Sequence, residues 1–179
     1  MSCIPNLPSP DAVFEGICGL LDVRFDRSIG KECDQEQTKL LKLYFEGLAT
    51  SCGVRAEEYD AWGRPTNGPR RCGLRWMDGT SEVAAIAWDW RTEGDLTTFK
   101  NLLARKAPLK VFLMDSGTAK AELRAKGILD CLDKCIRSVG TFDLLAVVFV
   151  TGRKGLLARA VKIVPGRAER LIRKKPVRR

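Results

Sequence analysis

The stretch from Arg70 to Asp115 constrains the fold of this 179-residue chain more than any other. It holds two apolar-rich runs joined by Asp78-Gly79-Thr80-Ser81, then an amphipathic segment from Leu96 to Lys106 and a short apolar run from Leu109. An Asp-Gly pair between two such runs predicts a tight β-hairpin. The stretch therefore predicts a hairpin, a helix and a strand in that order.

The same turn predicts which residues of the two hairpin strands face each other. If the chain reverses at the centre of the turn, paired positions in an antiparallel ladder sum to about 159 or 160. Ala87 then lies opposite residue 72 or 73, and Asp89 lies opposite residue 70 or 71. Because side chains alternate between the faces of a strand, we expect Ala87 and Asp89 to share one face.

The composition is that of a globular protein, with 45% hydrophobic and 30% charged residues. No apolar run approaches the roughly 18 residues of a membrane helix, and the N-terminus lacks a signal-peptide pattern. We therefore expect an intracellular, cytoplasmic protein with no membrane partner. The length predicts a single domain over residues 1–166, with N-terminal helices at 9–53 and a core at 55–164, followed by a basic tail at 167–179.

The residues that are missing exclude several kinds of chemistry. The chain has no histidine, and its seven cysteines include no C-x-x-C pair. These absences exclude Ser-His-Asp and Cys-His catalysis and the zincin motifs, and they leave no spacing suited to structural zinc. We therefore expect no metal and no cofactor.

Charge is concentrated at the C-terminus. The formal net charge is +9, and residues 167–179 hold seven basic residues and one acidic residue, a net charge of +6. A run of this kind favours a polyanionic partner, most often nucleic acid; the alternative is a solvated terminus that only aids solubility.

Hydrophobic periodicity predicts the other elements. Two helices come first, the second of them between Asp34 and Gly53, and a short strand is expected near Tyr59. After the hairpin, helix and strand, a long helix from Thr118 leads to a continuous apolar run at 143–150, which is typical of a buried central strand. Residues 156–164 are predicted as an edge strand. The fold class is therefore α/β, with a mixed central sheet flanked by helices on both faces.

Over roughly Asp34 to Val150, the chain resembles the restriction-endonuclease-like fold of the PD-(D/E)xK nuclease superfamily. The resemblance rests on the hairpin and on the two stretches Asp95-Leu96-Thr97-Thr98-Phe99-Lys100-Asn101-Leu102-Leu103 and Lys106-Ala107-Pro108-Leu109-Lys110-Val111-Phe112-Leu113. It implies a restriction-endonuclease-like sheet on which two acids of neighbouring strands hold Mg²⁺ against a phosphodiester.

This chain departs from that pattern at the acids. By the resemblance, the first acid falls at Gly73 and the second at Ala87, so that Asp89 alone remains as a catalytic candidate. A single carboxylate binds Mg²⁺ poorly, because this ion gives up its water reluctantly. We therefore expect a nuclease-fold protein with an inactive metal site, binding nucleic acid, DNA more than RNA, or a nucleoprotein complex.

Two alternatives remain open. One is an active Mg²⁺-dependent endonuclease in which Asp89 acts with Asp60 or Glu46 as metal ligands. The other is a protein-interaction subunit or inhibitor that makes no contact with nucleic acid. For the favoured interpretation, the candidate contacts to phosphates are basic residues of the hairpin, the following helix and the tail, namely Arg70, Arg71, Arg75, Lys100, Arg173, Lys174 and Lys175.

Overall fold

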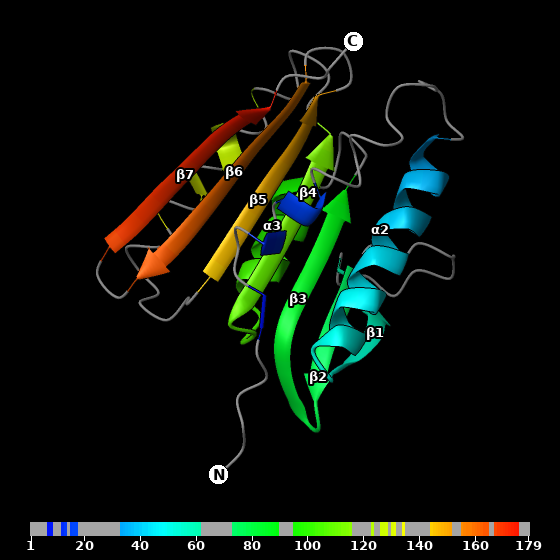
Figure 1. The fold of residues 1–179 in the computed structure, drawn as a ribbon. Helices are drawn as coiled ribbons and strands as arrows, with labels where there is room; N and C mark the ends of the chain where they lie inside the picture. Colours follow the sequence, from blue (N-terminus) through cyan, green and yellow to red (C-terminus); the bar gives the residue numbers. More distant parts are fainter. Residues whose placement is uncertain are drawn as a thin grey trace.

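Seven strands in the described part of the chain form one mixed sheet, in which each strand lies beside its neighbour in the sequence. In the computed structural model, an N-terminal helix α2 precedes the sheet and a helix α3 interrupts it (Figure 1). The bounds are α2 Cys33–Ser51, β1 Arg55–Tyr59, β2 Gly73–Asp78, β3 Ser81–Asp89, α3 Asp95–Leu103, β4 Leu109–Asp115, β5 Leu144–Thr151, β6 Gly155–Val164 and β7 Arg167–Lys175.

The structure describes residues 7–8, 12–13, 15–17, 33–61, 73–89, 95–115, 123, 126–128, 130–131, 134, 144–151, 155–164 and 167–175. For residues 33–37, 89, 95, 114–115 and all described residues from 144 onward, the description is of the backbone alone.

The β2–β3 hairpin has the predicted register. Gly73 pairs with Ala87, and the ladder shifts by one residue between Trp76 and Met77, so both predicted sums occur on either side of a β-bulge. Gly79 has a φ of 58° at the first central position of the turn, where a type II′ hairpin requires a positive φ. The predicted partner of Asp89 at residues 70 or 71 lies outside the described residues.

The middle of the sheet is parallel. Strand β3 pairs in parallel with β4, and β4 with β5, whereas the other four strand pairs are antiparallel. Parallel neighbours need a crossover connection, which α3 provides between β3 and β4. The described residues between Leu123 and Lys134, in the connection from β4 to β5, are helical.

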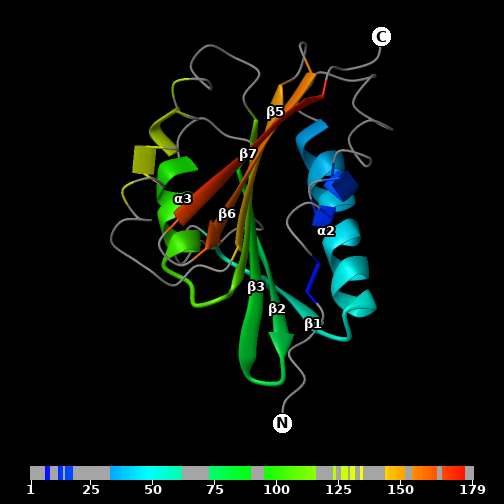
Figure 2. The ribbon, with the colours of Figure 1, turned by 60° about the vertical axis from the view of Figure 1, so that its left-hand side comes forward.

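The two labelled helices cover opposite faces of the sheet, with α2 on one side and α3 on the other (Figure 2). This arrangement confirms the predicted α/β class with a mixed sheet and helices on both faces. Beneath α2 lies the larger core, in which Leu41, Phe45 and Ala49 of the helix pack on apolar side chains of the sheet, among them Trp76 and Trp88.

The C-terminus of α2 is fixed by its backbone. Gly53 has a φ of 72°, its N–H donates to the carbonyl of Thr50 at 3.0 Å, and the N–H of Val54 donates to the carbonyl of Ala49 at 3.0 Å. These two bonds form a Schellman motif, which needs a left-handed residue at the position of Gly53. The sequence predicted this stop.

On the α3 side, the core contains Phe99 and Leu102 of the helix and Phe112 of β4, and the rings of Phe99 and Phe112 lie 5.3 Å apart. Leu96, the first residue of the predicted amphipathic segment, is 42% exposed, and the buried face of α3 begins at Thr98 and Phe99.

The C-terminal residues differ most from expectation. The sequence suggested an edge strand at 156–164 followed by a tail at 167–179, whereas β6 is paired on both sides and Arg167–Lys175 forms the edge strand β7. The two strands are joined by Pro165-Gly166, a dipeptide typical of turns. Because charged residues dominate this segment, the sequence analysis predicted a tail there and not a strand.

The left-handed stop of α2 yields a test of stability. We expect Gly53→Ala to lower the free energy of unfolding by about 1 kcal/mol, because an alanine side chain disfavours a positive φ. Gly47→Ala, in the same helix, should instead raise it by roughly 0.5–1 kcal/mol, because alanine favours the helix and its added Cβ would meet open space. Urea denaturation of both variants measures the difference; equal shifts would show that the Gly53 backbone is not constrained.

Candidate functional site

The positions expected to hold metal ligands lie in one row across the sheet. Tyr59 of β1 pairs with Gly73 of β2, Gly73 pairs with Ala87 of β3, and Ala87 lies beside Phe112 of β4. Adjacent strands are about 4.8 Å apart, so carboxylates at positions 73 and 87 would share a site. The residues actually present supply a hydrogen atom and a methyl group.

The space above Gly73 is occupied by the ring of Tyr59. A Cβ added at Gly73 would lie 2.6 Å from Cε1 and 2.8 Å from Cζ of Tyr59, and 3.0 Å from the carbonyl oxygen of Ile86. Any side chain at position 73 would displace this ring. The position expected for the first acid therefore has no carboxylate, and the ring of Tyr59 occupies the space beside it.

The ring of Tyr59 also contacts an ion pair. The guanidinium of Arg105 lies 4.3 Å from the centre of the ring. Arg105 donates from Nε to Oε1 of Glu82 at 2.6 Å, and its Nη2 bonds the second carboxylate oxygen. A cation at this distance is attracted to the ring face, and the paired carboxylate keeps the guanidinium in place.

These contacts shift two pKa values. Burial raises the pKa of the Tyr59 hydroxyl well above its ordinary value, although the charge of Arg105 acts in the opposite direction. The hydrogen bonds to Glu82 raise the pKa of Arg105. The Tyr59 hydroxyl is buried and has no hydrogen-bond partner among the described residues. It is therefore a neutral group, unsuited to act as a base.

On the same face of β1 as Tyr59, two residues before it, lies Glu57, which pairs with Arg75 of β2. Arg75 donates to Oε2 of Glu57 from Nη2 at 2.7 Å and from Nε at 2.9 Å, and Arg55 contacts Oε1 at 2.5 Å. Two arginines thus neutralise Glu57. The same contacts occupy Arg75, which was a candidate for phosphate binding.

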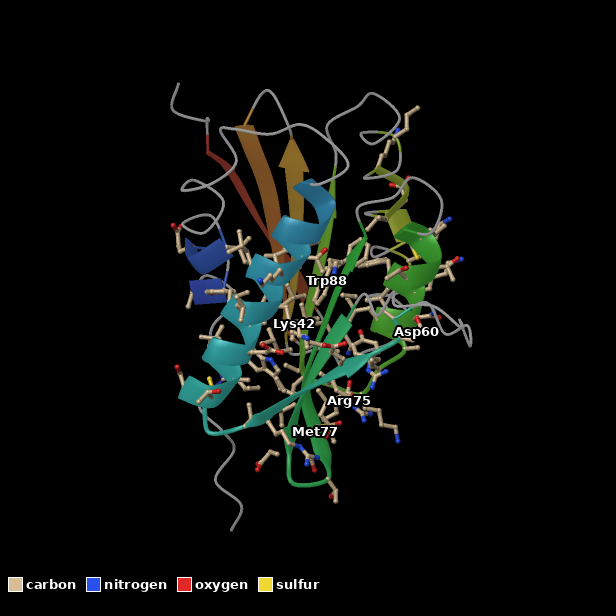
Figure 3. The ribbon with its side chains drawn as sticks, turned by 90° about the vertical axis from the view of Figure 1, so that its right-hand side faces the viewer. Lys42, Asp60, Arg75, Met77 and Trp88 are labelled. Atoms are coloured by element: carbon tan, nitrogen blue, oxygen red, sulfur yellow. The ribbon has the colours of Figure 1, made fainter. Side chains whose placement is uncertain are left out.

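Glu46 and Asp60, the two possible partners of Asp89 in the active-nuclease alternative, lie on opposite sides of the sheet. Glu46 belongs to α2 and lies 3.8 Å from Lys42, which also bonds Glu58. Asp60 lies on the α3 side (Figure 3), where the carbonyl of the adjacent Ala61 accepts a bond from Asn101 of α3. The sheet therefore separates Glu46 from Asp60.

Asp89, the one catalytic candidate, is the last residue of β3, and its backbone lies beside Met114 of β4. Among the side chains that the structure describes, no three acids or cysteines are close enough to share a metal ion. The sequence analysis predicted a strand near Tyr59 but not its register with β2. It therefore did not predict that the ring of Tyr59 would cover Gly73.

The remaining basic candidates are spread over the molecule. Lys100 is exposed on α3. Three others, Arg173, Lys174 and Lys175, belong to β7. Arg70 and Arg71 lie outside the described residues. Among the residues that the structure describes, no helix has both the length and the apolar character needed to cross a bilayer.

Comparison with known proteins gives no relative: no protein-family profile, curated protein or solved structure matches this chain. Its function must therefore be argued from its own geometry and charge.

The buried hydroxyl of Tyr59 has no hydrogen-bond partner among the described residues, and we therefore expect its removal to be favourable. We expect Tyr59→Phe to raise the free energy of unfolding by about 1 kcal/mol at neutral pH. A hydroxyl that is buried without a partner loses its hydrogen bonds to water and gains none in the folded protein. The advantage should widen above about pH 10, where the unfolded wild-type tyrosine ionises and the folded one, with its raised pKa, resists ionisation. Denaturation curves against pH test this; a less stable variant would reveal a bonded hydroxyl.

The contact between Tyr59 and Gly73 predicts coupling between the two positions. We expect Gly73→Ala to cost roughly 1–3 kcal/mol of stability by overpacking. In a Tyr59→Ala background the same change should cost less by about 1 kcal/mol or more, since the ring is gone. Gly127→Ala, whose Cβ would meet open space, is the control that should show no coupling. Additive effects at positions 59 and 73 would contradict the closure.

Proposed function

We propose that this chain is a restriction-endonuclease-like scaffold that binds nucleic acid and does not cut it. The observation that carries the proposal is the row Tyr59, Gly73 and Ala87, in which both acid positions lack a carboxylate and one is covered by an aromatic ring.

The arrangement of the core supports the scaffold. The resemblance rests on a hairpin, a helix and a strand, and the chain has β2–β3, α3 and β4 in that order, with β4 parallel to β3. Gly73 faces Ala87 in the register on which the loss of the acids depends. Helices α2 and α3 cover the two faces, as in the three-layer arrangement expected from the sequence.

The chemistry of Mg²⁺ supports the absence of cleavage. Phosphodiester hydrolysis by a metal site needs an ion that orients the phosphate and activates water, and Mg²⁺ is held in such sites by carboxylates and substrate oxygens. Beside this row, the carboxylate of Glu57 already binds Arg75 and Arg55. Asp89 alone would provide a weak site.

The charge supports nucleic acid as the partner. Residues 151–179 hold eleven basic residues and one acidic residue, a net charge of +10, whereas the whole chain carries +9. The first 150 residues are therefore close to neutral. A positive charge gathered at one end of the chain attracts a polyanion, and phosphate contacts of this kind bind without reading sequence.

The test is binding and cleavage measured on the same preparation. We expect the protein to bind a short DNA duplex equally well in EDTA and in Mg²⁺, with affinity falling steeply as salt rises. Incubation with plasmid in Mg²⁺ or Mn²⁺ should leave the DNA intact. Cleavage that is abolished by Asp89→Ala would establish the active endonuclease instead, and absence of binding at low salt would favour a protein-interaction subunit.

A further inference from the structure

The C-terminal strands β6 and β7 form an antiparallel hairpin, residues 155–175, which we name the basic hairpin. It contains seven basic residues and one acidic residue, a net charge of +6. Its nine paired positions run from Leu156 with Lys175 to Val164 with Arg167. The charge is thus mounted on a regular ladder at the edge of the sheet and not on an extended tail.

The register assigns the basic positions to faces. Val111 packs in the α2-side core, and the ladder relates it through Ala146 of β5 to Ala160 of β6. Since positions alternate along a strand, every second residue from Ala160 belongs to this face. The basic positions of the α2 side are therefore Lys162, Arg167, Arg173 and Lys175, and those of the α3 side are Arg159, Arg170 and Lys174. The one acidic residue, Glu169, pairs with Lys162 on the α2 side, so each side carries a net charge of +3, and the two sides differ in what covers them.

The α2 side of the basic hairpin has no described helix over it. Helix α2 packs against β1 and β2, and α3 packs against β3 and β4. The described helical residues 12–13 and 15–17, whose Val13 and Ile17 belong to the α2-side core, lie in front of β4 in Figure 1. The described helical residues between Leu123 and Lys134 lie on the α3 side of the sheet (Figures 1 and 2). Of the described parts of the chain, none crosses in front of β6 and β7 in Figure 1.

The charge of this sheet edge determines which kind of ligand it can bind. An edge strand offers unpaired backbone groups to a second strand, but rows of basic residues oppose pairing with another copy of the same edge. Basic positions two residues apart, such as Arg173 and Lys175, are separated by roughly 6.6 Å along the strand. A row of phosphates provides negative charges at a comparable spacing on a long, regular surface.

We infer that the α2 side of the basic hairpin is the surface that holds the phosphate backbone of DNA, through Lys162, Arg167, Arg173 and Lys175. This inference rests on the proposed function and adds to it the place and the mode of contact. Binding is electrostatic and independent of sequence, and the α3-side row of Tyr59, Gly73 and Ala87, where a nuclease would grip its substrate, takes no part.

The experiment compares two variants that lose the same charge. The first carries glutamine at the four hairpin positions Lys162, Arg167, Arg173 and Lys175. The second carries glutamine at four exposed lysines elsewhere, namely Lys39, Lys106, Lys126 and Lys134. Affinity for a short DNA duplex is measured against salt for both variants and for the wild type, after circular dichroism has shown that each is folded.

The hairpin variant should lose about 3 to 4 from the slope of log K against log salt, because each phosphate contact contributes about 0.9. The lysine variant should keep the slope of the wild type. If the fourfold hairpin variant does not fold, the pair Arg173→Gln and Lys175→Gln carries the same test with a loss of about 1.8.

Equal losses of slope in the two fourfold variants would overturn the inference while leaving nucleic-acid binding intact. Binding would then depend on the total charge and not on the position of the basic residues. A wild type that fails to bind at low salt would overturn the proposed function as well. If the hairpin variant keeps the full slope of the wild type, the inference is wrong and the DNA contacts another surface.

Discussion

The ring of Tyr59 against the backbone of Gly73 is the contact on which the character of this protein depends. It fixes the last residue of β1 beside the first residue of β2, and it fills the space that a side chain at position 73 would occupy. Arg105, which is paired with Glu82, lies 4.3 Å from the centre of the ring. A ring packed in this way makes the site a part of the core, where packing density and not chemistry decides which residues are tolerated.

The charges near Tyr59 and those of the C-terminal segment are organised differently. Around the closed row, the charges are paired at short range: Glu57 with Arg75 and Arg55, and Glu82 with Arg105. Paired charges of this kind cancel over a few ångströms and exert little force on a distant ligand. The charges of residues 151–179 have almost no acidic counterpart in that stretch of the sequence, so that their field extends into solvent.

Local turn chemistry explains how much of this could be predicted from the sequence. Asp78-Gly79 determines the hairpin, and the hairpin determines that Gly73 faces Ala87, so the central feature of the site followed from four residues of turn. The end of α2 at Gly53 followed from the same kind of reasoning. The position of Tyr59 did not, because the register between β1 and β2 depends on a connection of thirteen residues with no tight turn to set it.

The C-terminus shows the opposite limit. Composition indicated a charged tail, and the structure has a strand, because pairing with β6 satisfies the backbone whatever the side chains are. The overlooked indication was Pro165-Gly166, which carries more information about the backbone than the charged residues around it. The sheet that results is mixed, and its two outer strands differ: β1 has five residues and β7 has nine.

The chain-order arrangement of the sheet bears on how the protein is made. Each strand pairs with the strand synthesised immediately before it, and none has to be threaded between two strands already in place. A growing chain can therefore add strands at one margin as they leave the ribosome, while the separation between partners stays short. The charged strand comes last, so that throughout synthesis the apolar margin of the unfinished sheet is exposed only until the next segment of chain arrives.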